Sequence, residues 1–198
     1  MNNYTYIFNN QLYLNITNKC SNNCSFCVRL DCNGVEGNEL WLDKEASFPD
    51  MKESLKKYDL RNFEEVVFCG FGEPTSNYET LIKTAEYLKK NGVKTLRLNT
   101  NGQGSLFNQR NIVPELAGYI DIISISLNAS NAAEYQDVCK SVFGEKGFFA
   151  MLDFAKECLK YVKSVYMTKV DAGDDAENKR CEVLCRQLGA KFKLRERW

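Results

Sequence analysis

The sequence predicts an α/β fold in which six parallel strands alternate with helices as a partial (β/α)6 barrel of the TIM type, preceded by an N-terminal hairpin. Short apolar strand patterns recur along the chain, and a helical pattern follows nearly every one. Within 121–128, Ile123 and Ile125 alternate with Ser124 and Ser126. One apolar and one polar face suit a sheet with helices outside and a polar interior. An open doubly wound sheet, the alternative, is expected to be apolar on both faces.

The elements follow one another without a linker, a low-complexity tract or a repeat, so residues 1–198 are interpreted as one domain. Strands are predicted at 4–8 and 12–17, which form the hairpin across Asn9-Asn10, and at 64–69, 94–99, 121–128, 164–170 and 191–195. Helices are predicted at about 49–58, 77–91, 131–140, 147–162 and 175–188. Pro49 suits a first helical turn, whereas Gly92 and Gly189 are typical of helix ends.

The composition excludes several classes of function. The 26 basic and 26 acidic residues balance, which argues against the basic surface that nucleic acids or anionic membranes require. No apolar run reaches a membrane-spanning length, and the polar start MNNYTYIFNN is not a signal peptide. We therefore expect a soluble cytoplasmic protein. The absence of histidine argues against most zinc sites and against His-dependent triads.

Unusual residues follow four successive predicted strands. A cysteine cluster follows the first, Gly-Phe-Gly-Glu-Pro (70–74) the second and Asn-Thr-Asn-Gly (99–102) the third, while Asn128 ends the fourth. The carboxyl ends of parallel strands meet at one edge of a sheet, where α/β proteins carry their chemistry. The sequence thus predicts that these four loops form one site.

Three of the nine cysteines have the spacing C-x3-C-x2-C: Cys20, Cys24 and Cys27. Three thiolates on one loop can hold three corners of a cuboidal iron–sulfur cluster and leave one iron open to another ligand. Cys32 is the alternative fourth ligand, which would close the cluster for electron transfer. A zinc knuckle and buried thiols are the other interpretations of the triplet. The remaining five cysteines are interpreted as mostly structural.

This motif, with the aromatic Phe26 before its last cysteine, resembles that of the radical S-adenosylmethionine (SAM) enzymes. The resemblance includes GFGEP and the strand pattern, and it spans nearly the whole chain. It implies a [4Fe–4S] cluster on Cys20, Cys24 and Cys27 whose open iron binds SAM. It also implies reductive cleavage of SAM to a 5′-deoxyadenosyl radical, which abstracts hydrogen from a substrate. An external one-electron reductant of the flavodoxin or ferredoxin type is implied as well.

The resemblance also assigns roles to residues at the strand ends. Gly70 and Gly72 would let the backbone approach a ligand, Glu73 would accept hydrogen bonds from the SAM ammonium, and Pro74 would rigidify the loop. Asn99 and Asn101 match positions near SAM or a bound cation, and Ser124, Ser126 and Asn128 match residues that contact the SAM ribose and carboxylate. The fifth strand lacks the family's Gly-rich adenine motif, so adenine contacts stay unassigned.

The segments LYLNITNKC, VVFCGFGEP and NIVPELAGYIDIISISLNA are similar to those of the compact TatD-associated radical SAM family. The predicted strands and helices occupy the chain, so we expect either a small substrate or a partner protein that completes the site. Glycyl-radical-enzyme activases use a protein substrate and 7-carboxy-7-deazaguanine synthases a small one; the long 28–48 loop favours the small substrate. An iron–sulfur electron-transfer or redox-sensing protein is the alternative outside enzymes.

Overall fold

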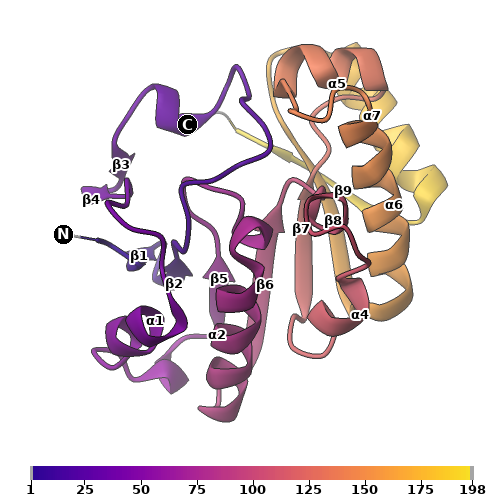
Figure 1. Cartoon of the computed structure of the whole chain (residues 1–198). Helices are drawn as coiled ribbons and strands as arrows, with labels where there is room; N and C mark the ends of the chain where they lie inside the picture. The colour runs from indigo at the N-terminus through magenta and orange to yellow at the C-terminus, as the bar shows by residue number, and fades with distance from the viewer. Residues whose placement is uncertain (1, 197–198) are drawn as a thin grey trace.

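The computed structural model describes residues 2–196. Within them, seven strands form one sheet in the order β1-β2-β5-β6-β7-β8-β9 (Figure 1). The strands are β1 (Thr5–Phe8), β2 (Gln11–Leu14), β5 (Glu65–Phe68), β6 (Thr95–Thr100), β7 (Ile122–Ser126), β8 (Ser164–Val170) and β9 (Lys191–Arg195). Every neighbouring pair from β2 to β9 is parallel, which confirms the predicted mixed α/β fold with a mostly parallel sheet.

The chain opens with the predicted antiparallel hairpin. Strand β1 pairs with β2 in a register that sets Thr5 opposite Leu14 and Phe8 opposite Gln11. Asn9 and Asn10 form the turn, with φ of 49° and 59°. Asparagine tolerates this left-handed backbone, and a two-residue turn with both φ values positive matches the twist of the flanking strands.

The helices connect the parallel strands. They are α1 (Phe48–Leu55), α2 (Tyr78–Lys90), α3 (Gly104–Phe107), α4 (Val113–Leu116), α5 (Ala132–Cys139), α6 (Lys146–Tyr161) and α7 (Asp175–Leu188). Side-chain caps fix several starts: Ser47 and Asp50 form a capping box on α1, Asn131 caps α5 and Asp174 caps α7. Gly189 ends α7 in the left-handed conformation, as its position in the sequence predicts.

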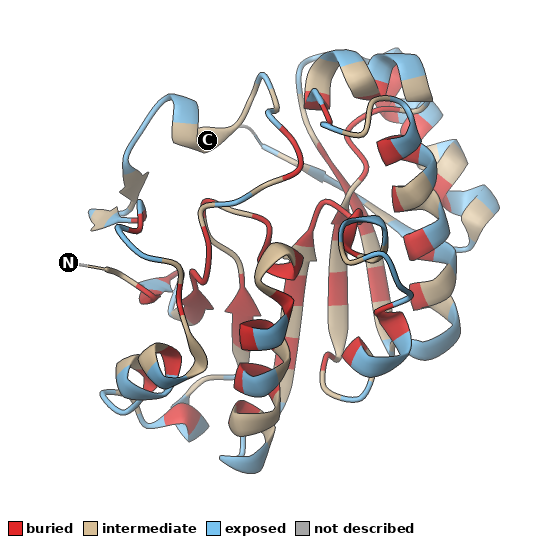
Figure 2. Cartoon of the chain, in the orientation of Figure 1, coloured by how far each residue is buried: buried red, intermediate tan, exposed pale blue. Residues whose placement is uncertain are grey.

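The two faces of the sheet differ, because alternate residues of each strand point to opposite faces. Leu96, Leu98, Ile123 and Ile125 are fully buried in a core that also contains the apolar residues of α1, α2 and α4–α7. We call this side the helix face and the opposite side the inner face. Figure 2 shows the alternation as bands along the strands. Helices on one face match a partial barrel, and a doubly wound sheet would need them on both.

The inner face is not uniform. Over β1, β2 and β5 it carries a second, smaller apolar cluster, formed by Tyr6, Phe8, Tyr13, Leu40, Val67 and Phe71. Leu40 belongs to the segment 28–42, which also contributes Val28 and Val35 to this cluster. The segment therefore covers one half of the inner face.

Several short elements were not predicted. The long loop after β2 contains a 3-10 turn, η1 (Val28–Leu30), and the two-residue strands β3 (Gly34–Val35) and β4 (Asn38–Glu39). Two further 3-10 turns are η2 (Leu60–Asn62) and η3 (Pro74–Asn77). The helices α3 and α4 are four residues each, too short to show a helical period in the sequence.

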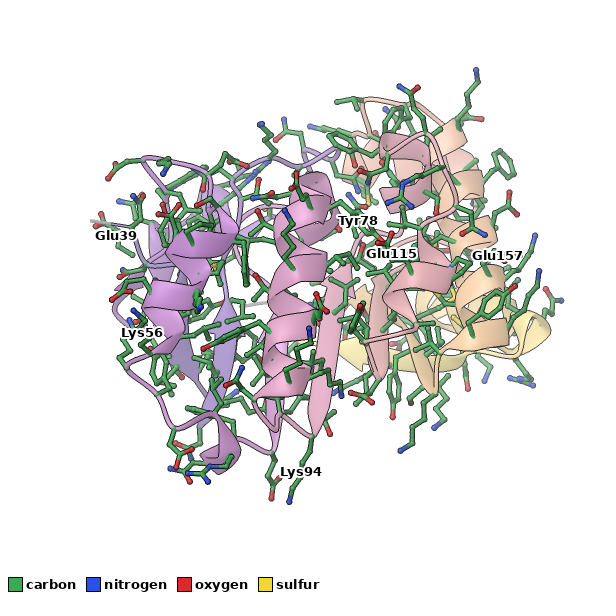
Figure 3. The ribbon with its side chains drawn as sticks, turned by 60° about the horizontal axis from the view of Figure 1, so that its bottom comes forward. Glu39, Lys56, Tyr78, Lys94, Glu115 and Glu157 are labelled. Atoms are coloured by element: carbon green, nitrogen blue, oxygen red, sulfur yellow. The ribbon has the colours of Figure 1, made fainter. Side chains whose placement is uncertain are left out.

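The helices also contact one another on the helix face. Tyr78 of α2 donates a hydrogen bond of 3.0 Å to the carboxylate of Glu115 in α4, and the two side chains lie next to each other in Figure 3. Nowhere in residues 2–196 does a helix combine the length and the apolar character needed to cross a bilayer.

Candidate active site at the carboxyl ends of the strands

The segment 18–28, which we call the cysteine loop, leaves β2 and is fixed to the end of helix α5. The backbone N–H of Asn23 donates to the carbonyl of Cys139 at 3.0 Å, and that of Ser25 to the carbonyl of Val138 at 2.9 Å. In return, the N–H of Val142 donates to Ser21 at 2.9 Å. These bonds join segments more than 110 residues apart in the sequence. The position of the cysteines therefore depends on where α5 ends.

The three motif thiols are half-buried on this loop and lie near one another. Cys20 interacts electrostatically with Cys24, and Cys24 with Cys27. Burial raises the pKa of Cys20 to about 12 and also raises the pKa of Cys27. The pKa of Cys24 is raised because its thiol donates a hydrogen bond to Cys139. The free chain thus holds protonated thiols, and binding iron must displace their protons.

The donor set fits a cluster better than a single metal ion. In the part of the chain that the structure describes, no three cysteine or acidic side chains converge closely enough to hold one ion. A cuboidal cluster binds each thiolate at a different corner, so its ligands stand further apart than those of one ion. Three thiols that neighbour one another without sharing a centre match that requirement.

Cys32 lies outside this group, after η1. It is exposed, and its thiol contacts two carbonyls of its own segment, those of Val28 at 3.3 Å and Gly34 at 2.9 Å. Phe26, by contrast, is half-buried and packs against the main core. The guanidinium of Arg29 donates to the backbone carbonyls of Asn18 and Asn22 and so ties both halves of the cysteine loop together.

Glu73 connects the loop after β5 with the end of β6. Its side chain is 5% exposed, and its Oε1 accepts hydrogen bonds from both the N–H and the hydroxyl of Thr75 and from the hydroxyl of Thr100. Its Oε2 accepts one bond, from the N–H of Asn101 at 2.6 Å. Burial raises the pKa of Glu73, although these donors favour the carboxylate. Each carboxylate oxygen has two lone pairs, so Oε2, which accepts one bond, has a second acceptor position.

The glycines of the 70–74 segment have neighbours from the protein itself. A Cβ on Gly72 would lie 2.3 Å from the carbonyl of Thr17 and 2.7 Å from that of Lys19, and one on Gly70 would meet the side chain of Asn15. The sequence predicted that these glycines let the backbone approach a ligand. In the structure they let the backbone approach the chain at the start of the cysteine loop. Pro74 is buried and begins η3, which fixes the backbone after Glu73.

A buried polar network supports the cysteine loop from below. Asn101 donates to the hydroxyl of Ser21 at 2.9 Å and, more weakly, to the sulfur of Cys20 at 3.9 Å. Gln103 accepts from Ser21 at 2.8 Å and donates to Asn22 and to the hydroxyl of Tyr135, both at 2.9 Å. Fully satisfied buried networks rigidify the backbone that they connect. Asn101 thus holds the cysteine loop in place through its own hydrogen bonds.

The remaining predicted residues lie at the ends of β6 and β7. Asn99 and the half-buried Ser124 and Ser126 lie on the inner face, and Asn128 follows β7 with a φ of 60°. The side-chain oxygens of Asn99 and Asn128 are buried without a hydrogen-bond partner among the described residues. Buried acceptors are rarely left unpaired, and these two lie at the same edge of the sheet.

Three further residues shape the site: Cys139, which sequence reasoning grouped with the mostly structural cysteines, and Gln103 and Tyr135, which it missed. Cys139 is fully buried, its sulfur contacts Cys24 and accepts from Asn128 at 3.6 Å, and these bonds lower its pKa. Gln103 follows the Asn-Thr-Asn-Gly segment directly, which was the available signal. Tyr135 gave none, because one aromatic on an amphipathic helix is usually core. A hollow of about 550 Å³ on the outer surface of α7, lined by Arg180 and Leu184 among others, includes none of the predicted site residues.

Comparisons with solved structures agree with this architecture. A radical SAM methyltransferase from Sphaerobacter thermophilus superposes with a TM-score of 0.66 at 14% identity, over 97% of this chain and 68% of that one. SuiB from Streptococcus suis, bound to S-adenosylmethionine, gives 0.66 at 15% identity, over 94% of this chain and 38% of that one. The structure of native anSMEcpe with bound AdoMet gives 0.64 at 14% identity, over 94% and 50%. At such identities the likeness concerns the fold.

This chain spans half or less of the length of two of these three proteins. No curated protein sequence matches it. The model of the radical SAM superfamily, whose members bind a [4Fe–4S] cluster and S-adenosylmethionine, matches residues 14–176. That range includes the cysteine loop, Glu73 and the ends of β6 and β7. The chain belongs to the radical SAM superfamily and is an enzyme of that class.

Proposed function

We propose that this enzyme holds a [4Fe–4S] cluster on Cys20, Cys24 and Cys27 and cleaves SAM reductively, with electrons from an external donor of the flavodoxin or ferredoxin type. When bound, the cluster and SAM supply a 5′-deoxyadenosyl radical, which removes a hydrogen atom from the substrate. The observation that carries the proposal is the position of the three thiols. They lie on one loop at the carboxyl edge of the sheet, the edge at which the side-chain oxygens of Asn99 and Asn128 are buried without a hydrogen-bond partner among residues 2–196.

The chain's own residues provide the surroundings of SAM in this proposal. Glu73 keeps one acceptor position on Oε2 for the SAM ammonium, while its other bonds hold the β5 and β6 loops together. Asn99 and Asn128 accept donors from the ligand through their unpaired oxygens. Ser124 and Ser126 present hydroxyls from the inner face to the ribose or the carboxylate. Gly70, Gly72 and Pro74 position Glu73, and Phe26 anchors the cysteine loop on the core.

We propose further that the chain is a cytoplasmic member of the compact TatD-associated family with a small-molecule substrate. The short loops at the strand ends, together with the covering segment 28–42, support a small substrate held by this chain. A protein substrate, as in glycyl-radical-enzyme activation, would need the same edge to be open to a partner. An activity that resembles 7-carboxy-7-deazaguanine synthesis would act on a small substrate held by this chain. An electron-transfer protein with Cys32 as fourth ligand is disfavoured, because that thiol contacts its own segment.

A pair of cysteine variants tests the proposal. After anaerobic reconstitution with iron and sulfide, Cys24→Ala should lose the cluster absorbance and, with dithionite and SAM, all 5′-deoxyadenosine above background. Cys32→Ala is the matched control and should keep both, because its thiol lies outside the triplet. A wild-type protein with a full cluster that forms no 5′-deoxyadenosine would contradict the proposal. Loss of the cluster in Cys32→Ala would instead establish the electron-transfer alternative.

A further inference from the structure

Strand β9 places a row of cations on the inner face. Lys191 pairs with Tyr166 and Lys193 with Thr168 across the β8–β9 ladder. Residues opposite each other in a ladder share a face, and Lys191 confirms this, because its Nζ lies 5.3 Å from the ring centre of Tyr166. Arg195, two residues beyond Lys193, continues the row toward the carboxyl edge. We call Lys191, Lys193 and Arg195 the basic row.

Within residues 2–196, the strands supply no counterion for this row. Among the side chains that the strands within residues 2–196 place on the inner face, the acidic one is Glu65, and it forms an ion pair of 3.0 Å with Arg97. The charges of Glu65 and Arg97 cancel, so the strands leave the inner face with the three positive charges of the basic row. The whole chain is neutral, with 26 basic and 26 acidic residues. The fold therefore concentrates positive charge on this part of the inner face.

Arg195 has the strongest demand for an anion. Its Nε is buried without a hydrogen-bond acceptor among residues 2–196. Burial lowers the pKa of Arg195, which reflects the cost of desolvating the charge. A guanidinium stays charged in proteins, and a buried charge is costly unless it is paired. Arg97 also has a buried, unpaired Nε, and Asn99 has an unpaired oxygen on the same face.

The guanidinium of Arg195 lies near the candidate active site. It interacts electrostatically with Cys69, which directly precedes the 70–74 segment and is hydrogen-bonded to Asn99. Strand β9 is four strands from β5, about 19 Å away in a flat sheet. Curvature of the sheet brings the inner-face side chains of its two halves toward each other. An anion held by Arg195 would thus lie at the edge where the cysteine loop lies.

From this geometry we propose that Arg195, assisted by Lys193, binds a carboxylate or phosphate group of the substrate; the inference rests on the proposed function in taking this edge as the reaction site. The guanidinium offers a planar pair of donors that matches either group, and Lys193 adds a mobile second charge. The SAM carboxylate is the other source of such a group. If the anionic group belongs to SAM, SAM should compete with an added anion for Arg195. If it belongs to the substrate, SAM should not compete.

The test uses the reconstituted, cluster-loaded full chain before reduction, with pyrophosphate and citrate as probes in isothermal titration calorimetry. Wild-type protein should bind at least one probe, and Arg195→Gln should weaken that binding about tenfold, since a charge-assisted pair is lost. Arg195→Lys should lie between the two, because it keeps the charge and loses the planar fork. The matched control is Lys156→Gln on the outer side of α6, which removes one exposed charge and should change affinity less than twofold.

Saturating SAM distinguishes the sources of the anion. If Arg195 serves the substrate, SAM leaves the affinity of the probe within about twofold. If SAM displaces the part of the probe binding that Arg195→Gln weakens, Arg195 holds the SAM carboxylate and the substrate assignment is wrong. Failure of both probes to bind, or equal weakening by Arg195→Gln and Lys156→Gln, also overturns the inference. Because binding is measured without reduction, a protein that binds the probes and fails to cleave SAM refutes only the proposed function.

Discussion

The two halves of the inner face use the same strand geometry for different purposes. Over β1, β2 and β5 the face is apolar and covered by segment 28–42, whereas over β6 to β9 it carries serines, an asparagine and cations. The first half buries its side chains against the protein itself. Among residues 2–196, the second leaves the Nε atoms of Arg97 and Arg195 and the side-chain oxygen of Asn99 without a hydrogen-bond partner. The difference teaches that the first half contributes to stability, while the second has the unpaired polar groups that the proposed function assigns to ligands.

The largest expected effect lies in the apolar half. Leu40 is 1% exposed and packs in the small cluster of the inner face, so Leu40→Ala should lower the free energy of unfolding by about 2–4 kcal/mol through lost burial and a cavity. Denaturant unfolding measures it. The matched variant in the polar half is Ser126→Ala, which should change stability by less than about 0.5 kcal/mol and reduce 5′-deoxyadenosine formation. A Ser126→Ala variant as unstable as Leu40→Ala would remove the distinction between the halves.

The faces of the strands could be predicted, because alternation is local. Leu96 and Leu98 against Arg97 and Asn99 already indicate which side meets the helices, and the structure confirms it. The grouping of the strand-end loops followed from topology alone. The hairpin at Asn9-Asn10 needed only the backbone preference of asparagine.

The contacts within the site could not be predicted in the same way. The contact between Cys24 and Cys139 depends on the residue at which α5 ends, and helix ends are the least certain part of a sequence-based prediction. Glu73 was assigned to a ligand, yet most of its bonds go to Thr75, Thr100 and Asn101, which only the tertiary structure brings near. Arg195 sits in a sequence, KFKLR, that is typical of a charged edge strand.

A smaller effect is expected at the boundary between the halves. Glu65 and Arg97 are 14% and 23% exposed, and their ion pair neutralises a cation that contacts Tyr13 of the apolar cluster. Glu65→Gln leaves Arg97 partly buried without its counterion and should cost about 1–2 kcal/mol of unfolding free energy. The exposed pair of Glu53 with Lys56 is the control, and Glu53→Gln should cost less than about 0.5 kcal/mol. Equal costs would mean that the boundary pair is as solvated as a surface one.

The smallest effect is a titration that compares one tyrosine from each half. Burial in the apolar half raises the pKa of Tyr6 above its usual value of 10.0, because the phenolate would lose its water. In the polar half the pKa of Tyr166 is lowered, by a hydrogen bond from Ser164 and by the charges of Lys191 and Lys193. As pH rises toward 10, Tyr166 should therefore ionise first while Tyr6 stays protonated. NMR of ring-labelled tyrosine resolves the two.

Lys191→Gln should shift the Tyr166 titration to higher pH by a fraction of a pH unit and leave Tyr6 unchanged, since that lysine lies on the Tyr166 ring and far from the apolar cluster. Added salt should produce the same upward shift in the wild type, because Lys191 and Lys193 are exposed and their attraction to the Tyr166 phenolate is screened. A Tyr166 that titrates at or above 10 in low salt would show that the basic row does not set the potential of this half. The anion site would then rest on Arg195 alone.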